Sequence, residues 1–119
     1  MKISILEDNF SVLQYENMPE GLEGIYFTAK TDDEVSVMCK SDSAPDGFIK
    51  REDGFRGLKI EGILDFGLFG VISRITSILA DNDIGVFVIS TFNTDYIFVK
   101  EENLSISCQL LFQSGYEII

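Results

Sequence analysis

Histidine and tryptophan are absent from this chain of 119 residues, and only two prolines and two cysteines are present. Without histidine the chain lacks the commonest general base, so a Ser-His-Asp or Cys-His hydrolase is excluded. Cys39 and Cys108 lie far apart in the sequence, and two cysteines without histidine do not supply the four ligands of a structural zinc site. We therefore expect two buried free thiols, no metal centre and no cofactor.

Basic residues are also scarce. Nine lysines and arginines face twenty acidic residues, which gives a formal charge of −11. Such a charge repels nucleic acids and anionic membrane surfaces. No apolar run reaches the roughly 18 residues of a membrane helix, and the first residues, MKISILED, are too short and acidic for a signal peptide. We expect a cytoplasmic protein that binds neither nucleic acid nor membrane.

Hydrophobic residues make up 45% of the chain and include ten phenylalanines, so a globular protein is expected. Residues 2–6 and 10–16 are apolar or alternating runs separated by the polar Glu7-Asp8-Asn9, which predicts a hairpin. Residues 25–30 and 34–40 predict a second hairpin. Proline, glycine and charge then gather in residues 41–57, which predicts an inter-domain connection. The chain therefore divides into a strand-rich half at 1–54 and a second domain at 55–119.

The pattern of the second domain changes from period two to helical spacing and back. Strands are expected at 58–64, 86–92, 95–100 and 116–119. A first helix is expected to end at Asp83-Ile84-Gly85, and a second to run from Glu101 to Gly115. The strands at 86–92 and 95–100 are almost wholly apolar, which is typical of the middle of a sheet. This order predicts an α+β, ferredoxin-like βαββαβ unit with both helices on one face, and a helix-poor first half that flanks or extends its sheet.

Two glycines mark the start of the first predicted helix, in the run LDFGLFGVISRI at residues 64–75. The first N–H groups of a helix lack intrahelical acceptors, and the bare Gly67 and Gly70 leave room for a carboxylate or phosphate. The alternative interpretation is that Gly67 only turns the chain, that Asp65 caps the helix, and that apolar neighbours pack into the core. Those neighbours are Phe66, Leu68 and Phe69.

Short polar side chains gather in the turn between the two apolar strands. Five of them lie within six residues: Ser90, Thr91, Asn93, Thr94 and Asp95. They are candidate ligand-binding groups, although polar residues of this kind also turn a chain by bonding its own backbone.

These motifs together resemble the ACT domain family. The matching features lie between residues 65 and 104: the acid-aromatic-glycine turn, the helix exit DNDIG, the hairpin ISTFNTD and the helix start VKEENL. Within the family they are similar to small bacterial double-ACT proteins that are themselves similar to the CASTOR arginine-sensor regulators. In the first half, the run EVSVMCK at 34–40 resembles the family's N-terminal strand beside the second ACT unit.

The resemblance implies a non-catalytic regulatory module that binds a small effector, in particular an amino acid, often between ACT units. It places the effector's carboxylate on the backbone of residues 67–70, and a cationic group on Thr94 and Asp95 or on Asp65. It also implies a homodimer or larger homo-oligomer.

The residues also suggest three alternative functions. Asp32, Asp33 and Glu34, or Asp81 and Asp83, carry oxygen ligands but lack the spacing of a calcium loop. An enzyme could use Asp65 and Asp95 as an acid-base pair, but no nucleophile or cofactor motif accompanies them, so we do not expect catalysis. The third alternative is a self-associating interaction module that binds no small ligand.

Overall fold

A computed structural model describes residues 1–62 and 70–119. Its elements are β1 (Lys2–Tyr15), β2 (Phe27–Lys30), β3 (Val35–Lys40), β4 (Lys50–Ile60), α1 (Val71–Ala80), β5 (Phe87–Ser90), β6 (Asp95–Lys100), α2 (Leu104–Gln113) and β7 (Glu117–Ile118). Short 3₁₀ turns, η1 (Ser41–Ser43) and η2 (Glu101–Asn103), follow β3 and β6. The chain forms two compact units: a C-terminal unit of Met1–Glu7 with Arg56–Ile119, and an N-terminal unit of Asp8–Phe55. The expected α+β class is confirmed.

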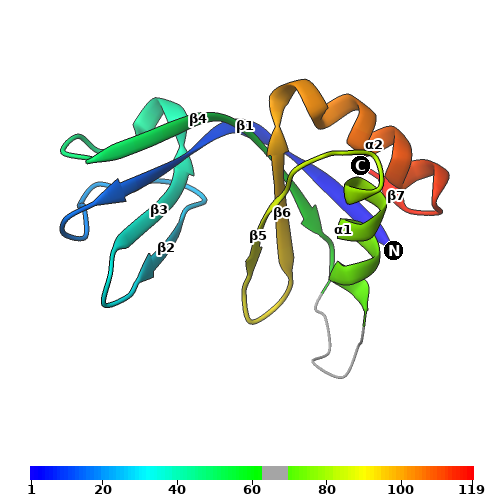
Figure 1. Cartoon of the computed structure of the whole chain (residues 1–119), viewed down its shortest axis with the longest axis horizontal. Coiled ribbons are helices and arrows are strands. Elements are labelled where there is room, and N and C mark those ends of the chain that lie inside the picture. The colour runs from blue at the N-terminus through cyan, green and yellow to red at the C-terminus, as the bar shows by residue number, and fades with distance from the viewer. Residues whose placement is uncertain (63–69) are drawn as a thin grey trace. The chain divides into compact units, whose positions relative to one another are not determined.

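The C-terminal unit is a sheet with two helices on one face (Figure 1). Its strand order is β7-β1-β4-β6-β5, where β1 contributes its first residues and β4 its last. Apolar side chains of the sheet and of both helices form the core, namely Ile3, Leu58, Ile60, Ile75, Leu79, Ile84, Ile97, Val99, Leu111 and Tyr116. Each fully buried side chain of this size contributes about 1.5–3 kcal/mol, so this core is the main source of the unit's stability.

The sequence determines where each helix ends. Apolar residues at helical spacing bring Ile75 and Leu79 of α1 into the core, and both are fully buried. Asp83 has a positive φ of 60°, and the Ile84 N–H donates to the Leu79 carbonyl at 3.0 Å, as in a Schellman ending. Gly115, with φ 100°, ends α2 in the same way. Both predicted helix ends are confirmed.

The N-terminal unit has strands but no α-helix among its residues, which are all described. Its strand order is β2-β3-β1-β4, and the antiparallel pairing of β2 with β3 confirms the predicted second hairpin. A small core lies on one face of these strands, formed by Leu13, Tyr15, Val35, Val37 and Cys39. Leu22 and Ala44, from the connections that follow β1 and β3, pack against this core. Loops therefore provide the cover that helices give in the C-terminal unit.

Two predictions of strand boundaries are wrong. Residues 2–16 do not form a hairpin, because β1 runs without a break through the exposed Glu7-Asp8-Asn9. Buried side chains lie on both sides of this polar stretch, Ile3 before it and Phe10 after it, and no glycine or proline interrupts the strand. The connection predicted for 41–57 is also too long, since residues 50–57 belong to β4.

Three further expectations about strand placement need correction. β5 is the last strand of its sheet, and its residues are half-buried or exposed, so it is not a central strand. The run 34–40 lies inside the N-terminal unit, between β2 and β1. Residues 2–7 instead belong to the C-terminal unit, where Lys2 and Ile3 pair in parallel with Glu117 and Ile118 of β7.

The two hairpins repeat one another at a separation of 60 residues. Phe27 pairs with Met38 and Lys30 with Val35 in the first hairpin, while Phe87 pairs with Phe98 and Ser90 with Asp95 in the second. In both turns the N–H of a threonine, Thr31 or Thr91, donates to a carbonyl three residues later at 2.9 Å. A 3₁₀ turn follows each second strand. The N-terminal unit therefore repeats the hairpin of the C-terminal unit without its helices.

A close contact at Gly57 generates the first testable prediction. A Cβ added there would lie 2.8 Å from Leu6 Cδ1 and 2.8 Å from Phe98 Cε1. Because this site is buried, Gly57→Ala is expected to lower the free energy of unfolding by about 1–3 kcal/mol. Gly85→Ala is the matched control, since a Cβ at Gly85 meets nothing within 4 Å. Urea unfolding measures both, and equal stabilities for the two variants would contradict this packing.

Candidate functional site

A pocket of about 260 Å³ lies at the turn of the β5–β6 hairpin, within the C-terminal unit. We call it the C-terminal pocket. It is lined by Lys59, Gly62, Thr91, Asn93, Thr94 and Tyr96. Three of the five polar hairpin residues singled out in the sequence, Thr91, Asn93 and Thr94, therefore line one cavity. Its volume suits a small metabolite rather than a nucleotide or a longer chain.

Thr94 attaches the turn to the end of β4. Its side chain is 4% exposed, and its hydroxyl donates to the Ile60 carbonyl at 2.6 Å. Its N–H donates to Thr91 Oγ1 at 3.3 Å, and the Thr91 hydroxyl donates to the Thr94 carbonyl at 3.0 Å. The proton of each of these two hydroxyls is thus used within the protein. Thr91 and Thr94 shape the pocket, and their hydroxyl oxygens remain acceptors.

Ser90 and Asp95 face each other across the first pair of the hairpin. The Ser90 hydroxyl donates to Asp95 Oδ1 at 2.5 Å. This side-chain hydrogen bond links the two strands at the turn end of the hairpin. Neither residue lines the C-terminal pocket. Their assignment to a ligand site stays a prediction.

Sequence reasoning missed three of the pocket residues, Gly62, Tyr96 and Lys59, and the charged one of the three is Lys59. Its ammonium lies 3.8 Å from Glu61 Oε1, and that oxygen accepts the Ser4 hydroxyl at 2.6 Å. The side chain of Lys59 is 34% exposed. The signal was present in the alternating run LKIEGIL, because Leu58 and Ile60 point into the core and place Lys59 on the opposite face.

The glycine turn falls mostly outside the described residues. Asp65, Phe66, Gly67, Leu68 and Phe69 lie there, and their role stays a prediction. Gly70 is described and has a left-handed backbone, with φ 77°, at the N-cap of α1. The helix begins at Val71, and the first helical bond joins the Arg74 N–H to the Gly70 carbonyl at 2.9 Å. Val71 to Ser73 therefore carry the N–H groups without an intrahelical acceptor.

A second pocket, of about 480 Å³, lies in the N-terminal unit at the turn of the β2–β3 hairpin. We call it the N-terminal pocket. It is lined by Gln14, Tyr15, Glu16, Asn17, Lys30, Thr31, Asp32, Asp33, Glu34, Val35 and Ile49. The sequence pointed to Asp32, Asp33 and Glu34 as oxygen ligands for a metal ion, but not to a pocket for a small ligand. The signal that would have found it is the match of the two hairpins at 60 residues.

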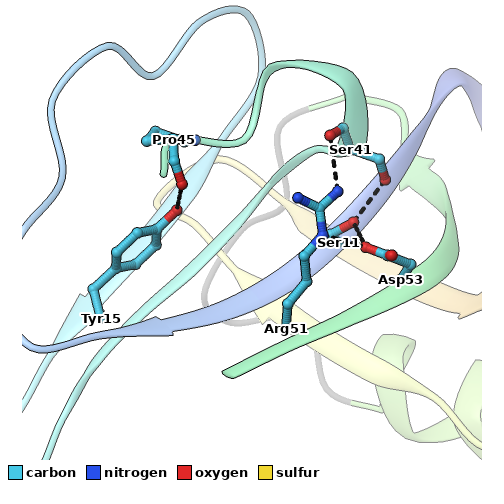
Figure 2. Close-up of polar contacts among 6 residues, drawn as sticks. All are labelled: Ser11, Tyr15, Ser41, Pro45, Arg51 and Asp53. Atoms are coloured by element: carbon cyan, nitrogen blue, oxygen red, sulfur yellow. Dashed lines mark hydrogen bonds and ion pairs between the residues drawn. The ribbon is translucent and has the colours of Figure 1, made fainter. Parts of the chain in front are cut away.

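A polar network holds the connection after β3 against β1 and β4 (Figure 2). The buried Ser11 hydroxyl donates to Asp53 Oδ1 at 2.5 Å, so the Ser41 hydroxyl must be the donor in its 2.7 Å contact with Ser11. Arg51 donates to Asp53 Oδ1 at 2.6 Å and to the Ser41 carbonyl at 2.9 Å. These groups bond one another, and we interpret the network as structural.

Burial also raises the pKa of titratable side chains, including Tyr15 next to this network. The Tyr15 hydroxyl donates to the Pro45 carbonyl at 2.6 Å, and burial raises the pKa of Tyr15. Both cysteines are free, but Cys108 is only partly buried, so the expectation of two buried thiols holds for Cys39 alone. Burial raises the pKa of both thiols. Raised pKa values keep both thiols protonated near neutral pH, so they are poor nucleophiles.

Within residues 1–62 and 70–119, no group of three or more acidic or cysteine side chains is placed to hold a metal ion. The same residues contain no helix that is long and apolar enough to cross a membrane.

Comparison with known proteins gives one family and several similar structures. A family model described as the ACT domain matches residues 50–111, just over half of the chain. A crystal structure of a protein from Agobacterium tumefaciens is 28% identical, with a TM-score of 0.89, and the match covers 99% of this chain and 91% of that one. No curated protein matches.

Two aspartate kinase structures share the fold at lower identity. The regulatory subunit of aspartate kinase from Thermus thermophilus, in a ligand-free form, has a TM-score of 0.67 at 9% identity, and the match covers 97% of each chain. Aspartate kinase from Clostridium acetobutylicum, described as an allosteric enzyme, has a TM-score of 0.71 at 12% identity. That match covers 93% of this chain but 33% of the kinase.

The buried hydroxyl of Thr94 generates the second prediction. Thr94→Val keeps the shape of the side chain but leaves the Ile60 carbonyl without this donor, so we expect a loss of about 1–3 kcal/mol in the free energy of unfolding. Thr28→Val, at an exposed position of β2, is the matched control. Thermal unfolding that is the same for both variants would show that this hydrogen bond does not hold the turn.

Proposed function

The chain belongs to the ACT domain family, and we propose that it is a non-catalytic regulatory module that binds an amino acid in the C-terminal pocket. The observation that supports this most strongly is the position of the cavity at the hairpin turn. The sequence alone predicts a polar site at this turn, and Thr91, Asn93 and Thr94 line the cavity. The glycine turn at residues 65–69 stays a predicted part of the same site.

The chemistry of the lining fits a small zwitterion. Lys59 supplies a cation for a carboxylate, while the Asn93 amide offers both a donor and an acceptor. The Thr91 and Thr94 oxygens supply acceptors for an ammonium group, because their own protons are already engaged. A volume of about 260 Å³ admits an amino acid and excludes much larger ligands.

We also propose that the N-terminal unit is an ACT-like half that has lost its helices. The matching hairpin register, the two equivalent threonine turns and the two 3₁₀ turns support an origin by duplication. Loops carrying Leu22 and Ala44 then stand where α1 and α2 would follow. On this proposal the chain is a small double-ACT protein, in line with the resemblance to the CASTOR regulators, and arginine is one of the amino acids to test.

The proposed function is tested by a thermal-shift screen of the twenty common amino acids. An amino acid at about 100 times its Kd stabilises the folded state by about 2.7 kcal/mol, which raises the Tm on the order of 10 °C for a chain of this size. We expect one or two amino acids to do so. Asn93→Ala should reduce the shift, and Asp33→Ala, at the equivalent place of the other hairpin, should leave it unchanged. A flat screen would contradict the proposal.

Self-association is the second function that a specific observation favours. β5 is the terminal strand of its sheet, and Val86, Phe87 and Val88 are each 37% exposed. Phe92, in the adjoining turn, is 80% exposed. An apolar terminal strand tends to pair with another strand, and a second copy of the same chain is the simplest partner. We propose a homodimer formed along β5.

The dimer is tested by placing a charge on this strand. Val88→Lys should shift the protein to monomer, because a lysine on a terminal strand opposes pairing between copies. Lys59 and the other pocket side chains are left intact. Sedimentation velocity measures the result, and Thr28→Lys on β2 provides a control with the same added charge. A monomeric wild-type protein, or a dimer that survives in Val88→Lys, would remove β5 from the interface.

A further inference from the structure

The two hairpin pockets occupy equivalent places in their own units. Each lies between the turn of a hairpin and the end of the strand that pairs with it, which is β4 for the C-terminal pocket and β1 for the N-terminal pocket. β4 ends at Ile60 and β1 ends at Tyr15, and a glutamate follows each. Five positions of the two linings correspond: Lys59 with Gln14, Gly62 with Asn17, Thr91 with Thr31, Asn93 with Asp33, and Thr94 with Glu34.

The charge of the two linings is opposite. Lys59 is the one charged side chain among the six residues of the C-terminal pocket. In the N-terminal pocket the uncharged Gln14 stands at the place of Lys59. Four carboxylates also line that pocket, on Glu16, Asp32, Asp33 and Glu34, and Lys30 is the single ammonium there. An anion is therefore attracted to one pocket and repelled from the other.

The Lys59 ammonium forms a long ion pair with Glu61 and keeps N–H donors for a ligand. Its 3.8 Å distance from Glu61 Oε1 is too long for a hydrogen bond, whereas Ser4 lies 2.6 Å from the same oxygen. An ammonium has three N–H donors, so an incoming carboxylate does not have to displace one already used by Glu61. The charge of −11 on the whole chain opposes anion binding, but screening confines that effect to about 8 Å at physiological salt, and Lys59 is the one charged residue that lines the pocket.

We propose that Lys59 is the residue that determines specificity for a carboxylate, and that of the two hairpin pockets only the C-terminal pocket binds one, so that the two pockets together hold a single carboxylate ligand. This inference rests on the proposed function for the site of binding. The inference adds two points to the proposed function: the group that recognises the anion, and the number of carboxylate ligands bound. The larger N-terminal pocket is expected to bind no carboxylate.

The test is an NMR titration of the ¹⁵N-labelled full chain with sodium acetate, with the twenty amino acids and with inorganic phosphate as separate probes. Amides of Thr91, Asn93 and Thr94 report on the C-terminal pocket, and those of Thr31, Asp33 and Glu34 report on the N-terminal pocket in the same sample. We expect acetate to shift the first set and leave the second set unchanged. Shifts of both sets, or of neither set, with acetate would overturn the inference, and so would shifts by phosphate without acetate.

Two variants show whether Lys59 carries the effect. Lys59→Gln makes the pocket resemble its counterpart at Gln14 and should weaken acetate binding at least about tenfold, since hydrogen bonds to charged groups contribute on that scale. Lys50→Gln removes the same charge from an exposed residue of the N-terminal unit and should change nothing. Equal binding by Lys59→Gln and the wild type would overturn the inference.

The same titrations separate this inference from the proposed function. If acetate binds through Lys59 and none of the amino acids binds, the inference stands and the proposed function fails. If an amino acid shifts Thr91, Asn93 and Thr94 equally in the wild type and in Lys59→Gln, the proposed function stands and the inference fails. An amino acid bound with a stoichiometry of two per chain, measured by calorimetry, would also overturn the inference.

Discussion

The antiparallel pairing of β1 with β4 is the constraint on which both units depend. The Glu61 N–H donates to the Lys2 carbonyl at 2.9 Å near one end of the pair, and the Ile49 N–H donates to the Gln14 carbonyl at 2.7 Å near the other. The two strands supply core residues to each unit, including Leu58 for one and Leu13 for the other. β7 also pairs with β1, so the C-terminal unit includes the first residues of the chain. The C-terminal unit therefore consists of two separate segments of the chain, whereas the N-terminal unit is the continuous segment between them.

The pockets follow from the same arrangement. Each of the two long strands ends beside a hairpin turn, and the last residues of the strand then form one wall of a pocket. Alternation along β4 puts Leu58 and Ile60 in the core and Lys59 on the other face, so the packing of the core also determines which residue charges the pocket. The equivalent position on β1 is occupied by Gln14. The two cavities therefore differ chemically, because one carries Lys59 and the other carries Gln14 with four carboxylates.

Much of the fold was predictable from the sequence because local signals agreed with long-range packing. Helical spacing with Asp83 and Gly115 at the ends located both helices, and the turns at Thr31 and Asn93 located both hairpins. The continuity of β1 was missed, because Glu7-Asp8-Asn9 has the composition of a turn although the strand continues through it. The terminal position of β5 was missed because pairing order depends on topology, which apolar content does not encode. Lys59 was missed because a lone lysine in a strand carries no motif.

A crystal structure of the chain grown with the amino acid that raises the Tm most would test the central claim most directly. The account predicts electron density for one ligand per chain in the C-terminal pocket, with its carboxylate within hydrogen-bonding distance of Lys59 Nζ and its other atoms against Asn93 and the threonine turn. Density for the ligand elsewhere on the chain, with the C-terminal pocket holding only solvent, would contradict the account.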